Sequence, residues 1–309
     1  MPASTVLQQI SAEREALVAS IVPRAVAVAV SRRRVLSGIH WRGAFVITAA
    51  EALGGADRVR LAWHGDGAAD SGFEIEDAEI AARDLTTDVA IIRTKRPPAE
   101  AVAVREDLRL GESVAIVGRD ARGPLGAWGM VSVAGPAWRS LRGGAIDRRL
   151  EIAARLDERL EGALIADTAG RAAAMLVAGP RNRALGIPAA TIERVLQSIE
   201  RRGYLPRPYL GVRLQALWLD SAAVTRFGRR SRRVPVVAGV EIGSPAASAG
   251  LEPGDLIEKV EGHEVGGIDE LMRAIATAGV GGTIRLGLRR GGELQDRSIT
   301  VAEQPRDAR

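Results

Sequence analysis

Short apolar runs separated by turn-forming residues dominate the first two thirds of the chain. Residues 58–63 alternate polar and apolar side chains, and residues 113–117 form a mostly apolar run. Clusters of Gly, Pro, Asp and Arg separate these runs from their neighbours. Many short strands with frequent turns are typical of β-sandwiches and β-barrels, so we expect a mainly β domain over residues 23–203.

Two segments follow the spacing of a helix instead. Apolar residues recur with helical spacing in residues 4–21 and again in residues 189–202. The first segment predicts a separate N-terminal helix within residues 1–22, and the second a helix with Gly203 as its C-cap. Two prolines in residues 204–208 then predict a linker.

The C-terminal third, residues 209–305, predicts a small α+β domain. A strand, a Gly-Ser-Pro-Ala turn with a short helix, and a second strand come first, and then a longer helix and two closing strands. The predicted elements cover residues 234–242, 246–250, 251–257, 268–278, 284–288 and 297–301.

Several motifs occur in the order found in one protease family. An apolar strand over residues 44–53 runs through Thr-Ala-Ala to Glu51, and residues 84–92 read Asp-Leu-Thr-Thr-Asp-Val-Ala-Ile-Ile with Asp88 as the second aspartate. Ala-Leu-Gly-Ile-Pro follows at residues 184–188. This order resembles the trypsin-like serine proteases of the HtrA (Deg) family. The resemblance implies a chymotrypsin/trypsin-like double β-barrel for the first domain.

The catalytic positions depart from that family. The resemblance places the histidine base at Glu51 and the aspartate that orients it at Asp88. There is no serine between Ser140 and Ser198, the interval that should contain the nucleophile. In an ungapped alignment Leu160 replaces that serine, and in the other alignment the loop has lost several residues. We therefore expect a catalytically inactive homologue without a serine nucleophile.

Two carboxylates at the catalytic centre would repel one another. We expect Glu51 and Asp88 to lie close together at the junction of the barrels, with an arginine, a water network or a shared proton in compensation. A carboxyl pair that shares a proton could also perform acid chemistry. We favour a relic site over such a pair.

A second motif belongs to the C-terminal domain. The pattern Gly-Ser-Pro-Ala…Gly-Leu-x-Pro-Gly-Asp-x-Ile over residues 243–257 resembles a PDZ domain. The resemblance implies that a C-terminal peptide binds by strand addition. The residues implied for the carboxylate loop and then for the side-chain pocket are Tyr209, Leu210, Gly211, Val212, Leu214, Leu271 and Ile275. Leu271 and Ile275 are equally compatible with an ordinary core.

Composition narrows the possible partners. The chain has 46% apolar and 26% charged residues, as expected for a globular protein of about two domains. A net charge of +5 allows anionic partners, but charges of both signs are mixed and only 3% of residues are aromatic, which argues against nucleic acid. We expect the arginine-rich run of residues 226–233 to be solvated surface.

No cofactor or metal site is predicted. The chain has no cysteine, which excludes disulfides and thiol catalysis, and His40, His64 and His263 lack metal-ligand spacing. Residues 1–15 show no basic-then-apolar leader, and Pro23 interrupts an apolar stretch that is too short to span a bilayer. We therefore expect a cytoplasmic protein without a membrane span.

Two functional classes remain open. The first is a noncatalytic scaffold or adaptor that binds protein C-termini or a partner protein, such as an active protease relative, within a homo- or hetero-oligomer. The alternative is an HtrA-like serine endopeptidase or quality-control protease with displaced catalytic residues. Because a fold does not by itself fix a function, the site has to decide between them.

Overall fold

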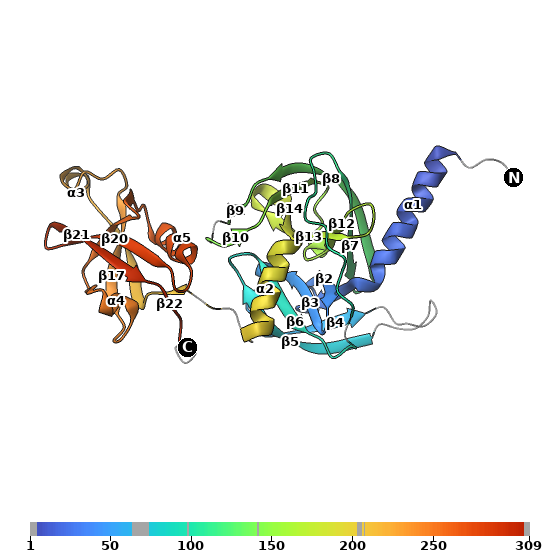
Figure 1. Cartoon of the computed structure of the whole chain (residues 1–309), viewed down its shortest axis with the longest axis horizontal. Coiled ribbons are helices and arrows are strands. Elements are labelled where there is room, and N and C mark those ends of the chain that lie inside the picture. The colour runs from blue at the N-terminus through green and yellow to red at the C-terminus, as the bar shows by residue number, and fades with distance from the viewer. Residues whose placement is uncertain are drawn as a thin grey trace. The chain divides into compact units, whose positions relative to one another are not determined.

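A computed structural model describes residues 5–63, 74–97, 99–140, 142–202, 206 and 208–305. The chain divides into two compact units (Figure 1), which comprise Met1–Trp138 with Ala145–Leu205, and Arg139–Gly144 with Pro206–Arg309. His64, the expected cap Gly203 and most of the expected linker over residues 204–208 lie outside the described residues.

The first unit opens with helix α1, Val6–Ile21. A reciprocal pair of hydrogen bonds caps it: the Gln8 amide donates to Thr5 Oγ1 at 3.3 Å, and the Thr5 amide donates to Gln8 Oε1 at 2.8 Å. Of the helix's residues only Ile21 is buried, and Leu7 is 79% exposed. The helix therefore packs on this unit through its C-terminal half, and its apolar N-terminal half lies in solvent.

A closed six-stranded barrel follows, in the order β1-β2-β3-β6-β5-β4. Its strands are Ala25–Ala29, Val35–Arg42, Phe45–Ala49, Arg58–Trp63, Glu74–Asp84 and Val89–Arg93, numbered β1 to β6. The expected alternation appears on β4, where Val59, Leu61 and Trp63 point into the core between more exposed neighbours.

The second barrel is also closed, in the order β11-β14-β13-β12-β7-β8. Its strands are β7 (Ser113–Asp120), β8 (Gly123–Gly135), β11 (Arg149–Ala153), β12 (Leu164–Ala166), β13 (Ala172–Gly179) and β14 (Arg183–Pro188). Two short strands, β9 (Trp138–Arg139) and β10 (Ala145–Ile146), pair with each other. The two barrels confirm the expected mainly β double-barrel architecture.

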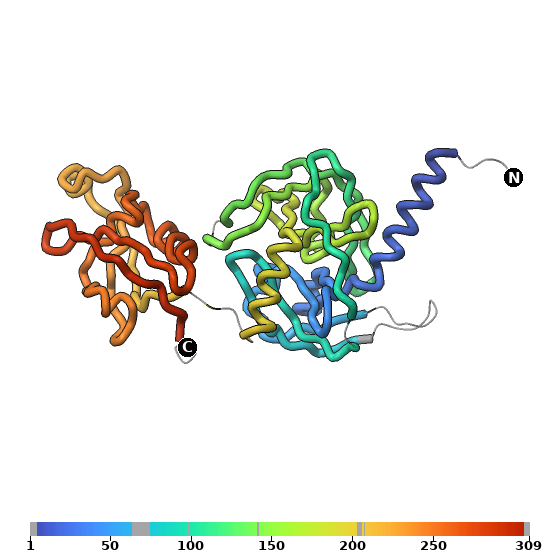
Figure 2. The backbone as a smooth tube through the Cα atoms, viewed as in Figure 1, coloured from blue at the N-terminus to red at the C-terminus, as the bar shows by residue number. Residues whose placement is uncertain are grey.

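One core cluster spans both barrels, and the second barrel has a further core cluster of its own. Strands β1 and β2 of the first barrel contact β7 of the second. Helix α2, Ala189–Arg202, contacts β6 of one barrel and β13 and β14 of the other. It is further tied to the first barrel by the Trp41 indole, which donates to Glu193 Oε1 at 2.6 Å. The colour in Figure 2 follows the chain from the blue and cyan first barrel into the green second barrel and then the yellow helix.

The second unit is a sheet with the strand order β16-β17-β18-β20-β21. Its larger strands are β16 (Val212–Trp218), β17 (Arg233–Val240), β18 (Leu256–Val260), β20 (Thr283–Arg290) and β21 (Glu293–Thr300). Shorter elements are β15 (Pro208–Tyr209), α3 (Ser221–Arg226), α4 (Pro245–Ser248), β19 (His263–Glu264), α5 (Ile268–Ala278) and β22 (Ala302–Glu303). Strand β16 lies at one edge of this sheet, and among the described residues it pairs along its length with β17 only.

Candidate functional site

Strand pairing brings Glu51 and Asp88 together. Glu51 begins a 3₁₀ turn directly after β3, and Asp88 directly precedes β6, the partner of β3 in the barrel. The Glu51 backbone N–H donates to Asp88 Oδ1 at 2.7 Å, and the Ala50 N–H donates to the Asp88 carbonyl at 3.3 Å. The expected proximity of the two residues is therefore confirmed.

Asp88 has the environment of a carboxyl group that keeps its proton near neutrality. Burial is the largest influence, and the carboxylates of Glu51 and Glu161 add to it, so that the pKa of Asp88 rises to about 7 although the Glu51 amide favours its ionised form. Burial also raises the pKa of Glu161. Among the described residues no arginine lies within salt-bridge distance of Asp88. With this raised pKa, Asp88 can retain a proton near neutrality, and that proton would relieve the repulsion at this carboxyl.

The loop that should contain the nucleophile is closed on itself. Asp157 caps a 3₁₀ turn over Glu158–Leu160 and accepts from the Arg159 amide at 2.9 Å. The Leu160 amide donates to the Asp157 carbonyl at 2.8 Å, and the Glu161 amide donates to the Glu158 carbonyl at 3.3 Å. The Leu160 side chain is only 4% exposed and packs in the core of the second barrel. Three successive amides of this loop therefore have internal acceptors.

Residues that sequence analysis missed hold this loop in place. Buried Ser37 donates its hydroxyl to the Arg159 carbonyl at 2.7 Å and accepts from the Arg119 amide at 3.0 Å. Its own amide donates to the Glu161 carbonyl at 2.9 Å. Gly162 has φ +87°, and a Cβ there would lie 2.2 Å from the Ser37 carbonyl oxygen.

The expected carboxylate loop of the C-terminal domain is shaped by its own packing. Gly211 has φ +78°, and a Cβ on it would lie 2.2 Å from Ser244 Cβ. The Leu210 carbonyl accepts from the Ala246 amide and the Gly211 carbonyl from the Glu241 amide, both at 2.9 Å. Glycine is thus required by the close approach of the next turn. A bulky charged residue at Gly211 would disturb the fold as well as any ligand contact.

The expected pocket residues differ in accessibility. Leu214 and Val212 are half-buried on β16, whereas Leu271 and Ile275 on α5 are 0% and 3% exposed and belong to the core. Their burial favours the core alternative for these two side chains. A charged replacement at Leu271 would therefore unfold the domain rather than test a groove. Tyr209 is half-buried, and its hydroxyl donates to Glu241.

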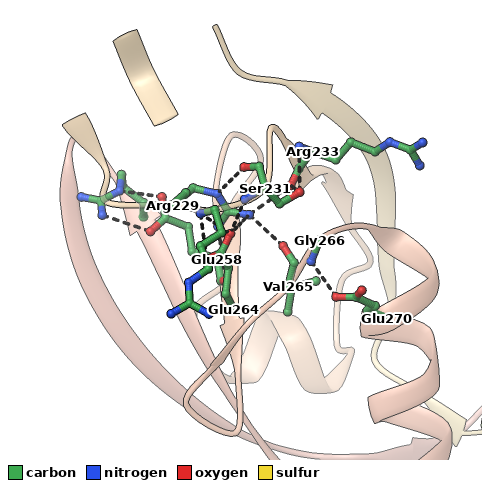
Figure 3. Close-up of polar contacts among 10 residues, drawn as sticks. Arg229, Ser231, Arg233, Glu258, Glu264, Val265, Gly266 and Glu270 are labelled. Atoms are coloured by element: carbon green, nitrogen blue, oxygen red, sulfur yellow. Dashed lines mark hydrogen bonds and ion pairs between the residues drawn. The ribbon is translucent and has the colours of Figure 1, made fainter. Parts of the chain in front are cut away.

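The arginine-rich run is not uniformly solvated, which corrects the expectation for residues 226–233. Arg229 is buried: its guanidinium donates to the carbonyls of Val265 at 2.7 Å, Arg233 at 3.0 Å and Glu258 at 3.3 Å (Figure 3). The other arginines of the run are exposed. Arg229 fastens the start of β17 to β18 and to the segment that leads into α5 (Figure 3).

Within the part of the chain that the structure describes, no three His, Asp or Glu side chains are grouped so as to hold a metal ion. In the same residues no helix combines the length and apolarity that crossing a bilayer requires.

Comparison with family models gives two matches. Residues 36–175 match the trypsin-like peptidase domain, and residues 208–301 match the PDZ domain. The first match covers strands of both barrels, and the second covers the sheet and α5 of the C-terminal unit.

The curated relatives that this chain matches are longer chains. A probable periplasmic serine endoprotease, DegP-like, from Brucella suis is 27% identical over 250 residues, which is 77% of this chain and 47% of the relative. The periplasmic pH-dependent serine endoprotease DegQ from Escherichia coli is 26% identical over 73% of this chain and 51% of its own. The chain spans about half the length of these curated relatives.

Solved structures agree in fold. The HtrA-type protease AlgW with decapeptide superposes with a TM-score of 0.61 at 22% identity, covering 94% of this chain and 98% of its own. A serine endoprotease from Yersinia pestis gives 0.61 at 21% identity, covering 99% and 100%. At these identities the likeness establishes the fold.

The chain therefore consists of a trypsin-like peptidase domain followed by one PDZ domain. The chain belongs to the HtrA family and is homologous to the DegP proteases. The expected cytoplasmic location is wrong, because the matched relatives are periplasmic endoproteases. That expectation relied on the composition of residues 1–15 and on the lack of cysteine, and neither reports the compartment of a folded chain.

Proposed function

We propose that this chain is a noncatalytic HtrA homologue that binds protein C-termini through its PDZ domain and acts as a scaffold or adaptor. The observation that carries the proposal is the closed loop over residues 157–161, in which the residue aligned with the nucleophile is a buried leucine. Its partners would be copies of itself or an active relative.

The physical argument concerns the three parts that acyl transfer needs. A serine protease requires a nucleophile, a base that takes its proton, and amides aimed at the developing oxyanion. Here Leu160 and Glu51 stand at the first two positions, and the amides of residues 159–161 donate within their own loop. The nucleophile and the base are replaced by other residues and the Leu160 amide has an internal acceptor, so restoring one part would not restore the others.

The alternative is an endopeptidase with displaced catalytic residues, and the names of the relatives favour it. The Ser37 hydroxyl donates a hydrogen bond to the Arg159 carbonyl of this loop. That hydrogen bond would have to break before Ser37 could act as a nucleophile. We expect no covalent labelling by a fluorophosphonate and no cleavage of casein or an unfolded substrate. Labelling or cleavage that disappears in the Ser37→Ala variant would establish the alternative.

A double substitution tests the closed loop directly. The double variant Glu51→His, Leu160→Ser gains a base and a hydroxyl. The backbone amide of residue 160 still donates to the Asp157 carbonyl in this variant. We expect this variant to remain unlabelled by the fluorophosphonate. Labelling that appears on substitution would mean that the loop reopens, and the argument from its amides would then be wrong.

Peptide binding is tested separately on the full chain. The open edge of β16 offers unpaired backbone groups beside α5, which is the arrangement used in strand addition. Fluorescence anisotropy with a library of labelled C-terminal peptides should find binders with an apolar last residue. If no peptide binds at high micromolar protein, the peptide-binding part of the proposal fails.

We also propose that the protein acts in the periplasm, as its relatives' names indicate for them. Fractionation of cells that express the natural full-length protein tests this. Recovery with cytoplasmic markers only would contradict it.

A further inference from the structure

An exposed tryptophan ends the open strand of the PDZ domain. Trp218 is the last residue of β16 and is 64% exposed, and Leu217 beside it is 40% exposed. Large aromatic side chains at an unpaired strand edge are typical of surfaces that bind a partner, because they bring a large apolar area and specific stacking geometry.

Strand periodicity places Trp218 on the same face as the groove. Side chains alternate along a strand, so Val212, Leu214 and Trp218 share one face of β16. Val212 and Leu214 on that face pack against the core cluster that contains residues of α5. Trp218 thus continues the α5 side of the sheet toward the other end of the strand, whereas Leu217 lies on the opposite face.

The guanidinium group of Arg233 lies beside the Trp218 ring. Trp218 pairs in register with Arg233 on β17, and the Arg233 guanidinium carbon lies 4.9 Å from the centre of the indole ring. Arg233 is exposed, and among the described residues no carboxylate lies within salt-bridge distance of it. In Figure 3 its side chain points away from the other side chains drawn.

The backbone beneath that cation is fixed. The Arg233 carbonyl accepts from buried Arg229 at 3.0 Å and from the Ser231 hydroxyl at 3.2 Å, and its amide donates to Ser231 Oγ at 3.1 Å. Arg230 and Arg232 are exposed in the same loop and add positive charge nearby. A fixed backbone with charged, exposed side chains is suited to selecting a ligand group by charge.

We propose that the peptide site extends along β16 to Trp218 and Arg233, where it selects an acidic side chain about six residues before the ligand's terminal carboxylate. The inference rests on the proposed peptide binding. An antiparallel ligand strand pairs residue for residue, so six steps separate partners of Val212 and Trp218, roughly 20 Å at the usual strand rise. The acidic group would pair with Arg233, and its methylene stem would pack on the indole.

The size of the expected preference for an acidic peptide follows from the solvent exposure of Trp218 and Arg233. A solvent-exposed ion pair and an exposed stacking contact each contribute modestly, so their sum corresponds to roughly a three- to tenfold change in Kd. Because the pair is exposed, the preference should weaken as the salt concentration rises.

The test uses full-length protein and labelled ten-residue peptides that share an apolar C-terminus. They differ only at the seventh position from the end, which is Glu, Ala or Lys, and a fourth peptide contains the last four residues alone. Kd values are measured by anisotropy for the natural chain, Trp218→Ala, Arg233→Ala and the control Leu217→Ala. We expect the Glu peptide to bind roughly three- to tenfold more tightly than the Lys peptide, a preference that Trp218→Ala and Arg233→Ala abolish and Leu217→Ala retains.

The outcomes separate this inference from the proposed function. All variants should bind the four-residue peptide alike, which shows that the groove is intact. If that peptide binds but the Glu, Ala and Lys peptides have equal affinity, the extended site does not exist although the PDZ domain binds peptides. If the preference for the Glu peptide survives both substitutions, the group that selects the acidic side chain lies elsewhere, and the inference is again refuted. If no peptide binds, both proposals fall.

Discussion

Replacing Asp88 by asparagine tests the electrostatics of the site formed by Glu51 and Asp88. Asparagine keeps an oxygen that can accept from the Glu51 amide, and it tolerates the positive φ of 60° at this position better than most residues. It cannot ionise. The substitution therefore isolates the cost of a buried charge beside Glu51 and Glu161 from the geometry of the turn.

The expected magnitude follows from the pKa of Asp88. Burial, with the two neighbouring carboxylates, raises that pKa from 3.8 to about 7 in the folded chain. Between these values the folded state binds more protons than the unfolded state, so stability falls as pH rises through the window and the full cost is present above pH 7. Relative to asparagine, the cost is about 1.5 kcal/mol at pH 5 and at most about 4 kcal/mol at pH 8.

Urea unfolding at pH 5 and pH 8 measures this difference. We expect Asp88→Asn to raise the free energy of unfolding at both pH values, with a gain about 2 kcal/mol larger at pH 8. Asp77→Asn, at an exposed carboxylate on β5, is the matched control and should change stability by less than about 0.5 kcal/mol. Groups that do not interact with Asp88 titrate alike in both chains and cancel in the comparison.

One result would refute the reasoning. If the gain from Asp88→Asn is the same at pH 5 and pH 8, Asp88 does not change its ionisation between them in the folded chain. The proton would then not be what relieves the carboxylate repulsion, and an ordered cation or a rearranged Glu51 would have to replace it.

Two further substitutions test the PDZ unit by urea unfolding. Gly211→Ala should lower the free energy of unfolding by about 2 to 4 kcal/mol, because backbone strain adds to the overlap with Ser244. The control Gly243→Ala has a similar φ of +75° but no atom within 4 Å, and it should cost only about 1 to 2 kcal/mol. Equal losses of stability in the two variants would contradict a role for the overlap. Arg229→Met should cost about 2 to 4 kcal/mol because buried carbonyls lose their donor. Arg226→Met, exposed in the same run, should stay within about 0.5 kcal/mol, and similar effects at both positions would show that burial of Arg229 does not matter.

The barrels and the PDZ sheet could be predicted because their signals are local. Alternation on β4 and the apolar run of β6 are properties of short stretches of sequence, and burial in the structure follows them. The motif order also located Glu51 and Asp88, since the pairing of β3 with β6 is part of the family fold. Strand β16 and helix α3 were not predicted from their own sequence.

The contacts that hold the sites could not be predicted because they join distant segments. Ser37 bonds to Arg159 across 122 positions, and nothing in either local sequence marks the pair. Arg229 is one of several arginines in its run, and only the surrounding carbonyls make it the buried one. Likewise the exposure of Trp218 depends on its position at the edge of the sheet, which the residue itself does not report.

The polar groups with and without hydrogen-bond partners indicate which domain of this chain is prepared to bind a partner. An active site keeps donors and charges ready for a substrate, and that readiness costs stability. In the loop over residues 157–161 the amides of residues 159–161 have acceptors, the Leu160 side chain is buried, and the Ser37 hydroxyl both donates and accepts a hydrogen bond. In the PDZ unit the edge of β16 is open, and Trp218 and Arg233 stand exposed beside it. The groups prepared for a partner thus lie on the PDZ domain, and from this asymmetry we infer that binding is the task of the chain.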